Sequence, residues 1–211
     1  MYLQVDNLRS YNWENALLGM RNPLESWARS DSKFDEDGNL IKLGEEDKTL
    51  AMKLIKAGPD HRKFLRQIFI SFVLTAPVYF LKEFDTYKIG TTWNSTSTMH
   101  KLTSRPLDIS DFCINDISDP YFLNSVKVLN DLIEEYNELC KKDFEDALKV
   151  WRKIIQYLPM SYKYVRSCTM NYETLRNMYR QRKHHKLEEW HNFKDWMING
   201  LPYPEFFTEN A

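Results

Sequence analysis

Apolar residues recur with a spacing of two along one segment of the chain, residues 64–75, while the opposite face mixes polar and apolar residues. One face of this segment carries five apolar side chains: Phe64, Ile68, Ile70, Phe72 and Leu74. In a β-strand successive side chains point to opposite faces of the sheet, so a spacing of two is typical of a strand with one buried face. The alternation predicts a strand over residues 64–75, which Ala76-Pro77 would end.

Elsewhere apolar residues recur every three or four positions, which is the spacing of a helix with one apolar side. This spacing predicts helices over residues 44–57, 78–84, 172–185 and 187–198. A longer apolar series runs from Leu129 to Leu158 and predicts one long helix, or two helices with a break near Lys141. Pro159 would end this helical region, because proline cannot continue a helix.

Three shorter stretches complete the pattern. Residues 91–98 are rich in Thr and Ser, and we expect them to form a loop that carries Trp93 and Asn94. Residues 110–120 predict a second loop, and residues 165–169 predict a short strand. Together the elements predict an α+β fold in which an antiparallel sheet packs against long helices.

Length and composition fit one globular domain over residues 1–211 or two small ones, and they favour one. Hydrophobic residues make up 43% of the 211 residues, which is enough for a sizeable core. Lys and Arg total 29 against 30 Asp and Glu, a formal net charge of −1. The chain as a whole has no field that would attract nucleic acid or an anionic membrane, so any anion site must be local.

The cysteines and the apolar stretches of the sequence indicate the cellular location to expect. Cys113, Cys140 and Cys168 are odd in number and far apart, so neither a disulfide framework nor a zinc site is expected. The longest apolar stretch, residues 68–81, is shorter than the about 20 residues that a membrane-spanning helix needs. Residues 1–9 lack the apolar region of a secretory signal. We therefore expect a cytoplasmic protein with no membrane partner.

Arg182 is the most informative charged residue. On a helix of about 100° per residue it falls in one stripe with Asn171, Leu175 and Met178, so a guanidinium ends a mostly apolar face. One interpretation is that Arg182 reaches water at the helix end and interacts with the helix dipole. The other is that a ligand is its partner, because arginine presents a rigid fork of donors that fits an oxyanion or a pyrimidine carbonyl.

Nucleic-acid binding, metal binding and hydrolase or P-loop catalysis have weaker support in the sequence. The basic run over residues 180–186, with Tyr164, Tyr172 and Tyr179, has the composition of a nucleic-acid contact, but a solvated helix end explains it better. His184, His185 and His191 with Asp195 lack the H-E-x-x-H pattern, so no metal site is expected. Neither a G-x-S-x-G elbow nor a Walker loop is present, which argues against hydrolases and P-loop enzymes.

Two separated blocks of residues resemble flavin-dependent thymidylate synthases. The first block contains Thr75-Ala76-Pro77, then Phe84-Asp85-Thr86-Tyr87-Lys88, then Asn94-Ser95-Thr96-Ser97. Asn94 and Ser97 match the asparagine and the second serine of the signature R-H-R-x-x-S-x-N-E-x-S-x-R-Y, whose first triplet falls on Thr86, Tyr87 and Lys88. The second block is Leu158-Pro159, Asn171, Asn177 and Arg182. The similarity spans residues 44–190.

The resemblance implies a homotetramer that binds FAD and uses NADPH and methylenetetrahydrofolate to methylate dUMP at C5. It implies that Arg182 activates the uracil ring as the catalytic residue and also binds substrate, and that Glu83 lies near the nucleotide. Ser95, Thr96 and Ser97 would bind the nucleotide phosphate. The implied cofactor-binding residues are Gln67, Tyr87, Lys88, Asn94, Asn171 and Asn177. No protein nucleophile is implied, because flavin carries the redox chemistry.

Some signature positions are altered. Met99 stands where the signature has an arginine for the dUMP phosphate, and Gln67 aligns with the family histidine beside the flavin. Lys101, Arg105 and Arg152 are candidates to replace the lost charge. Two alternatives to dUMP methylation stay open: a flavin or folate enzyme for another pyrimidine nucleotide, and a non-catalytic nucleotide- or nucleic-acid-binding protein of the same fold.

Overall fold

The computed structural model describes residues 3–209, and its chain contacts divide them into two compact units. The first unit contains the described residues up to Gln4 together with Thr75–Phe84 and Ser95–Arg166. The second contains Val5–Leu74, Asp85–Asn94 and the described residues from Ser167 onwards. Each unit is therefore assembled from segments that are distant in the sequence.

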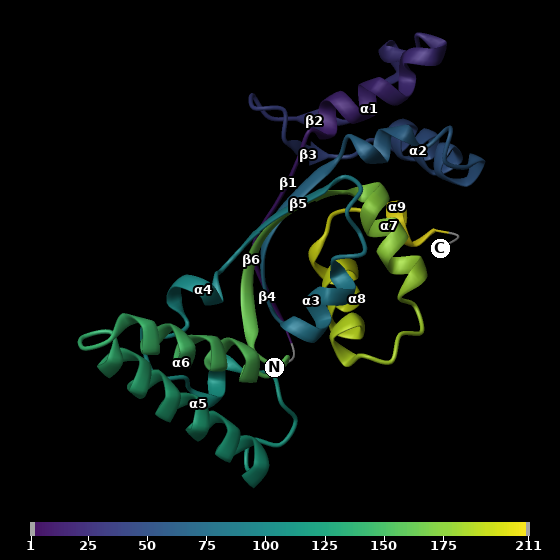
Figure 1. Ribbon diagram of the computed structural model, residues 1–211. Coiled ribbons are helices and arrows are strands. Elements are labelled where there is room, and N and C mark those ends of the chain that lie inside the picture. Colours follow the sequence, from purple (N-terminus) through teal and green to yellow (C-terminus); the bar gives the residue numbers. More distant parts are fainter. Residues whose placement is uncertain (1–2, 210–211) are drawn as a thin grey trace. The chain divides into compact units, whose positions relative to one another are not determined.

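The main sheet has four strands in the order β1-β4-β6-β5 (Figure 1). Their bounds are β1 Gln4–Tyr11, β4 Phe69–Pro77, β5 Thr91–Ser95 and β6 Lys163–Asn171. A second, two-stranded antiparallel sheet pairs β2 (Lys33–Phe34) with β3 (Leu40–Lys42). The expected α+β class with an antiparallel sheet is confirmed.

Strand β4 confirms the alternation seen in the sequence, but it begins later than predicted. Its residues alternate between buried and half-buried, with Ile70, Phe72 and Leu74 in the core. The predicted start at Phe64 is wrong, because residues Lys63–Arg66 form the 3-10 helix η3. Phe64 and Leu65 are both buried within this tight helical turn, so apolar residues next to a strand do not by themselves extend it.

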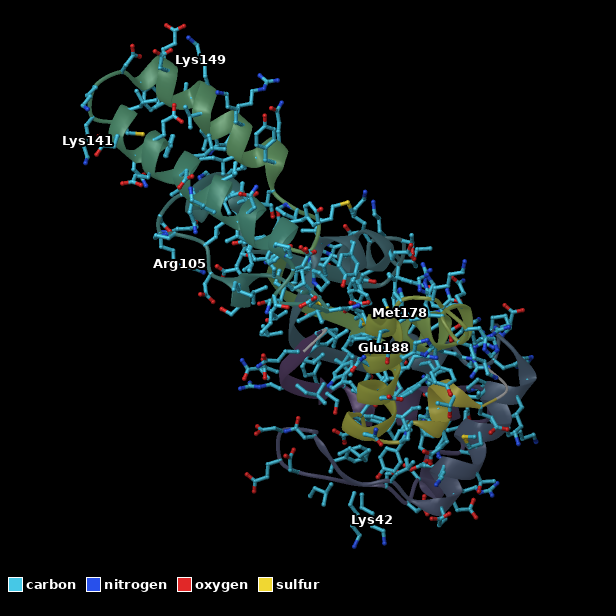
Figure 2. The ribbon with its side chains drawn as sticks, turned by 90° about the horizontal axis from the view of Figure 1, so that it is seen from below. Lys42, Arg105, Lys141, Lys149, Met178 and Glu188 are labelled. Carbon is cyan, nitrogen blue, oxygen red and sulfur yellow. The ribbon has the colours of Figure 1, made fainter. Side chains whose placement is uncertain are left out.

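In the first unit, α5 (Pro120–Leu139) and α6 (Phe144–Tyr157) form an antiparallel helix pair (Figure 1). The Asp119 side chain caps the first helix and the Asp143 side chain caps the second, so each satisfies backbone N–H groups that the first turn leaves free. Lys141 lies in the turn between them, and Lys149 lies on α6 (Figure 2). The predicted break near Lys141 is confirmed.

The first unit has its own apolar core. The first unit also contains three shorter elements: α3 (Val78–Phe84), α4 (Thr98–Lys101) and the 3-10 helix η4 (Ile109–Asp111). The buried cluster contains eight side chains: Leu102, Leu107, Phe112, Val126, Leu129, Ile133, Val150 and Ile154. The predicted helix at Val78–Phe84 is confirmed.

The second unit is built around aromatic packing. Its helical elements are α1 (Trp13–Arg21), η1 (Asn22–Leu24), η2 (Trp27–Arg29), α2 (Glu45–Ala57), η3, α7 (Tyr172–Gln181), α8 (Glu188–Gly200) and α9 (Glu205–Thr208). Trp13 contacts Tyr172 edge-on, with ring centroids 5.3 Å apart, and Phe206 packs against Phe64. Met178 on α7 and Glu188 at the start of α8 are labelled in Figure 2. These contacts join elements from both ends of this unit's sequence.

A buried ion pair fastens the loop before α2. The Nε of Arg21 donates to Asp47 at 2.7 Å, and Asp47 also accepts hydrogen bonds from the hydroxyls of Ser30 and Ser32. Burial alone would raise the pKa of Asp47, but the hydrogen bonds from Ser32, Arg21 and Ser30 outweigh it and lower the pKa. Asp47 therefore stays ionised inside the unit.

The expected loop over residues 91–98 is wrong, because β5 occupies Thr91–Ser95 and α4 starts at Thr98. β-Branched Thr residues and Trp93 suit a strand, and an edge strand tolerates polar side chains. The strand predicted at residues 165–169 is confirmed within the longer β6. The helix predicted to reach residue 185 ends at Gln181.

The sequence pattern did not predict β1 or α1. The helix predicted over residues 44–57 is confirmed by α2, which Gly58 ends with a φ of +109°, and the helix at residues 187–198 is confirmed by α8. Among the described residues, no helix is both long enough and apolar enough to cross a membrane.

Candidate functional site

A pocket of about 500 Å³ lies in the second unit, between helix α7 and the turn that precedes β5. Nine residues line it: Arg66, Thr86, Tyr87, Lys88, Ile89, Glu173, Thr174, Asn177 and Gln181. This set includes three of the predicted cofactor-binding residues, Tyr87, Lys88 and Asn177. We refer to this pocket as the α7 pocket.

One face of α7 supplies the polar wall of the α7 pocket. Glu173, Asn177 and Gln181 are spaced by four residues, so they lie above one another on the same side of the helix. Leu175 and Met178 point instead into the core. The helix therefore separates a polar stripe that lines the pocket from an apolar stripe that fixes its position.

The turn opposite α7 is held by two specific contacts. The hydroxyl of Thr174 donates to the carbonyl of Ile89 at 2.8 Å. Gly90 has a φ of +70°, and a Cβ added to it would collide with the side-chain amide of Asn171. Glycine is needed here both for the left-handed conformation and for the close approach. The backbone that carries Tyr87 and Lys88 is therefore anchored to the first turn of α7.

Arg182 follows the last residue of α7 and folds back onto the same turn. Its Nε donates to the hydroxyl of Tyr87 at 2.8 Å, and Nη2 lies 3.4 Å from the hydroxyl of Thr86. Its Cζ lies 4.9 Å from the ring centroid of Trp190 and 5.4 Å from that of Tyr87. The guanidinium is thus half-buried and held by stacking and hydrogen bonding, rather than extended into water.

The acidic residue of the pocket wall is paired. The Nε and Nη2 of Arg62 donate to both carboxylate oxygens of Glu173, at distances of 2.9 to 3.1 Å. This bidentate geometry fixes the carboxylate and neutralises its charge. Both partners are more than three-quarters buried, so the pair is shielded from solvent.

Asn171, Gln67 and Asn94 were also predicted to bind the cofactor, but they are not among the residues that line the α7 pocket. Asn171 is buried, and its Oδ1 accepts from the backbone N–H of Thr174 at 2.9 Å, so it caps α7. Gln67 is exposed at a second pocket of about 420 Å³, which also contains Gly19, Leu50 and Leu54. Asn94 lies exposed on β5.

The predicted substrate-binding residues other than Arg182 belong to the first unit. Ser95 ends β5 and is exposed, and Ser97 is the N-cap of α4. Thr96 is tied to Val165, because its backbone N–H donates to the Val165 carbonyl at 2.9 Å and its hydroxyl accepts from the Val165 N–H. Glu83 lies half-buried on α3.

One of the cations expected to replace the missing arginine already forms an ion pair within the protein. Arg105 forms a bidentate ion pair with Asp111, with distances of 2.6 and 2.7 Å. Asp111 raises the pKa of Arg105, and Arg105 lowers the pKa of Asp111, so the pair stays charged. Lys101 and Arg152 make no ion pair with any described residue, but neither lines the α7 pocket.

Sequence reasoning missed Arg66, Thr86, Gln181 and Trp190. The spacing of four from Asn177 to Gln181 was the available signal for the helix face. Arg66 gave no such signal, because it was assigned to a strand. The histidines form local contacts instead: the Nδ1 of His185 accepts from the Leu187 N–H, and His191 Nε2 lies 2.8 Å from the His185 carbonyl.

Comparisons with known proteins identify the fold. No protein-family model matches the sequence, and no curated protein matches it. Thymidylate synthase X from Helicobacter pylori, solved with FAD and dUMP, matches with a TM-score of 0.73 and 18% identity over 99% of this chain and 98% of that chain. A second structure, the flavin-dependent thymidylate synthase of the same organism complexed with FAD and dUMP, gives 0.69 and 17% over 100% and 99%.

A third structure is a UMP/dUMP methylase, PolB from Streptomyces cacaoi, bound with 5-Br dUMP. It matches with a TM-score of 0.50 and 16% identity over 82% of this chain and 75% of that chain. The chain therefore has the fold of flavin-dependent thymidylate synthases, in agreement with the resemblance of its two residue blocks.

Proposed function

We propose that this protein is an FAD-dependent enzyme that methylates dUMP to dTMP, using methylenetetrahydrofolate and NADPH. One observation carries the proposal: the α7 pocket gathers Tyr87, Lys88 and Asn177, three residues that the family resemblance assigned to the cofactor. The solved structures with this fold include one crystallised with both FAD and dUMP. We further propose a homotetramer as the working form.

The residues of the α7 pocket suit a flavin nucleotide. Asn177 and Gln181 offer amide donors and acceptors, which match the alternating donors and acceptors of a flavin ring or a ribityl chain. Ile89 provides exposed apolar surface against which a flat heterocycle packs. The donor set thus combines apolar contact with a few convergent polar groups, as ligand pockets usually do.

Arg182 is the residue we assign to substrate activation. A guanidinium donates two parallel hydrogen bonds and keeps its charge at any working pH. Aimed at the O4 edge of a uracil ring, it would stabilise negative charge that develops on that oxygen as C5 becomes nucleophilic. Its Nε is committed to Tyr87, and its stacking on Trp190 fixes the plane of the fork.

Bound FAD in its reduced form would supply the electrons that turn the transferred one-carbon unit into a methyl group. The chain's own groups would bind, orient and polarise. Asn171 would position the cofactor site indirectly, because it caps α7 and thereby fixes the helix that carries Asn177. Glu83, Ser95, Thr96 and Ser97 are the proposed contacts of the nucleotide, while Gln67 and Asn94 are proposed to contact the cofactor from outside the α7 pocket.

A flavin titration tests the cofactor part of this proposal. We expect the purified protein to bind FAD stoichiometrically, with a shift of the flavin absorption bands, and NADPH to bleach them. Asn177→Ala should weaken FAD binding, because a pocket amide is lost, whereas Asn192→Ala, which removes a half-buried amide on α8 outside the pocket, should not. If FAD remains unbound at high protein concentration in this titration, the proposal is wrong.

The fold shared with a UMP/dUMP methylase favours a second candidate, methylation of another pyrimidine nucleotide. Product analysis with dUMP, UMP and dCMP offered separately distinguishes the two. Turnover of UMP in preference to dUMP would keep the flavin chemistry and change the substrate.

A further inference from the structure

The α7 pocket carries an excess of positive charge. Arg66 and Lys88 both line it, and among the described residues neither forms an ion pair. Glu173 is the one acidic residue among the described lining residues, and Arg62 holds it in a bidentate pair. The two remaining cations therefore face the pocket without an internal counter-charge.

Both cations are carried by fixed backbone. Arg66 is the last residue of η3, whose turn buries Phe64 and Leu65 in the core. Lys88 lies in the turn that Thr174 anchors through the Ile89 carbonyl. Two segments that are separated by the whole of β4 and α3 thus bring one charge each to the same pocket. Repulsion between like charges in one pocket is relieved when an anion binds.

The neighbouring groups indicate the class of anion. Arg66 presents a fork of N–H donors, which fits the tetrahedral oxygens of a phosphate, and Lys88 supplies a compact charge. The hydroxyl of Thr86 and the amide of Gln181 line the same pocket and donate to oxyanions as well. A phosphate group offers acceptor oxygens to all four kinds of donor, whereas a neutral heterocycle leaves both charges unpaired.

We propose that Arg66 and Lys88 form a phosphate-binding subsite of the α7 pocket, which takes the phosphate or pyrophosphate group of a nucleotide. Such a subsite supplies positive charge that the altered signature lacks, since Met99 replaces an expected arginine and Arg105 is paired with Asp111. Only the identity of the phosphate's carrier rests on the proposed function. The charge and the pocket do not.

Inorganic pyrophosphate is the direct probe, because it tests the subsite without any flavin or uracil. We expect isothermal titration at low ionic strength to detect pyrophosphate binding to the wild type, and Arg66→Gln and Lys88→Gln each to weaken it about tenfold. Arg180→Gln is the matched control, because Arg180 is an exposed cation on α7 outside the pocket. Absence of binding to the wild type, or equal weakening by Arg180→Gln, overturns the subsite.

Paired ligands with and without phosphate identify the carrier. If the subsite holds the flavin's pyrophosphate, Arg66→Gln weakens FAD about tenfold and leaves riboflavin unchanged. If it holds the substrate's phosphate, the same variant weakens dUMP and leaves deoxyuridine unchanged. Pyrophosphate binding without FAD binding keeps the subsite and removes the proposed flavin function. If the binding of FAD and the binding of dUMP are both unchanged in the two variants, the flavin function is kept and the subsite is removed. Melting temperatures within about 2 °C of the wild type show that the variants are folded.

Discussion

The Nε of Arg182 donates a hydrogen bond to the hydroxyl of Tyr87 over 2.8 Å. These two residues are far apart in the sequence, and each belongs to a different block of the family resemblance. Tyr87 is almost completely buried, and its ring meets Trp190 edge-on with centroids 5.9 Å apart. Tyr87 therefore holds Arg182 as well as lining the α7 pocket, so it is a positioning residue for the guanidinium.

Tyr87→Phe should slow turnover without unfolding the protein. The variant keeps the ring that contacts Arg182 and Trp190 but loses the hydroxyl that orients Nε. A hydrogen bond to a charged group contributes about 1.5 to 3 kcal/mol, so kcat should fall about tenfold or more. Steady-state kinetics beside thermal melts would measure this, with the larger effect on kcat than on KM.

Tyr157→Phe is the control for that change, since Tyr157 is an exposed tyrosine on α6. Its kinetics should equal those of the wild type. Equal kcat values for Tyr87→Phe and the wild type would show that the hydroxyl does not position Arg182.

Gly90→Ala should destabilise the turn of the α7 pocket and weaken ligand binding. Alanine disfavours a φ of +70°, and its Cβ would collide with Asn171, the cap of α7. We expect a loss of about 2 kcal/mol or more in the free energy of unfolding, together with weaker FAD binding. Chemical denaturation and flavin titration measure the two effects.

Gly58→Ala separates strain from collision. Gly58 has a φ of +109°, but a Cβ there would meet no atom within 4 Å. Its ψ is −179°, a backbone region that is essentially restricted to glycine, so Gly58→Ala should cost about 1 to 3 kcal/mol of backbone strain and leave FAD binding intact. If Gly58→Ala weakens FAD binding as much as Gly90→Ala does, the close approach of Gly90 to Asn171 is not what links this turn to ligand binding.

Asp47→Asn should destabilise the second unit most strongly near neutral pH. Hydrogen bonds from Ser32, Arg21 and Ser30 lower the pKa of Asp47 against the effect of burial. Because the folded pKa lies below the unfolded one, the stabilisation is present above about pH 4 and is lost as pH falls through the folded pKa. Breaking a buried pair typically costs about 3 to 5 kcal/mol.

Urea denaturation of the wild type and of Asp47→Asn at pH 7 and at pH 3 measures that difference. The gap between the two proteins should shrink at the lower pH. Asp131→Asn removes an exposed carboxylate paired with Lys127 and should change stability by less than about 0.5 kcal/mol. A gap that is constant across this pH range would contradict the role of the Asp47 charge.

The sequence predicted best where one periodicity governs a long segment. The spacing of three and four residues located α5 and α6 and the break between them, because both helices bury one continuous apolar face. It located the buried face of β4 for the same reason. Phe64 was wrongly assigned to the strand. Its side chain continues the spacing of two, and nothing in the local sequence indicates that η3 lies just before β4.

Polar segments were the other source of error. Thr91–Ser95 pairs along the sheet edge, and composition alone does not distinguish an edge strand from a loop. The α7 pocket was predicted in part, because the resemblance named Tyr87, Lys88 and Asn177. The position of Arg66 in the pocket and the contact of Arg182 with Trp190 depend on tertiary packing. Such pairs depend on how separate segments pack, which a single sequence does not state.

Formation of dTMP from dUMP, followed by mass spectrometry in the presence of FAD, NADPH and methylenetetrahydrofolate, tests the central claim most directly. We expect dTMP only when all three are present, and a loss of about 10²- to 10³-fold in Arg182→Ala, because a donor to the developing oxyanion is removed. Wild-type protein that binds FAD and dUMP but forms no dTMP, or an Arg182→Ala variant with unchanged turnover, would contradict the account.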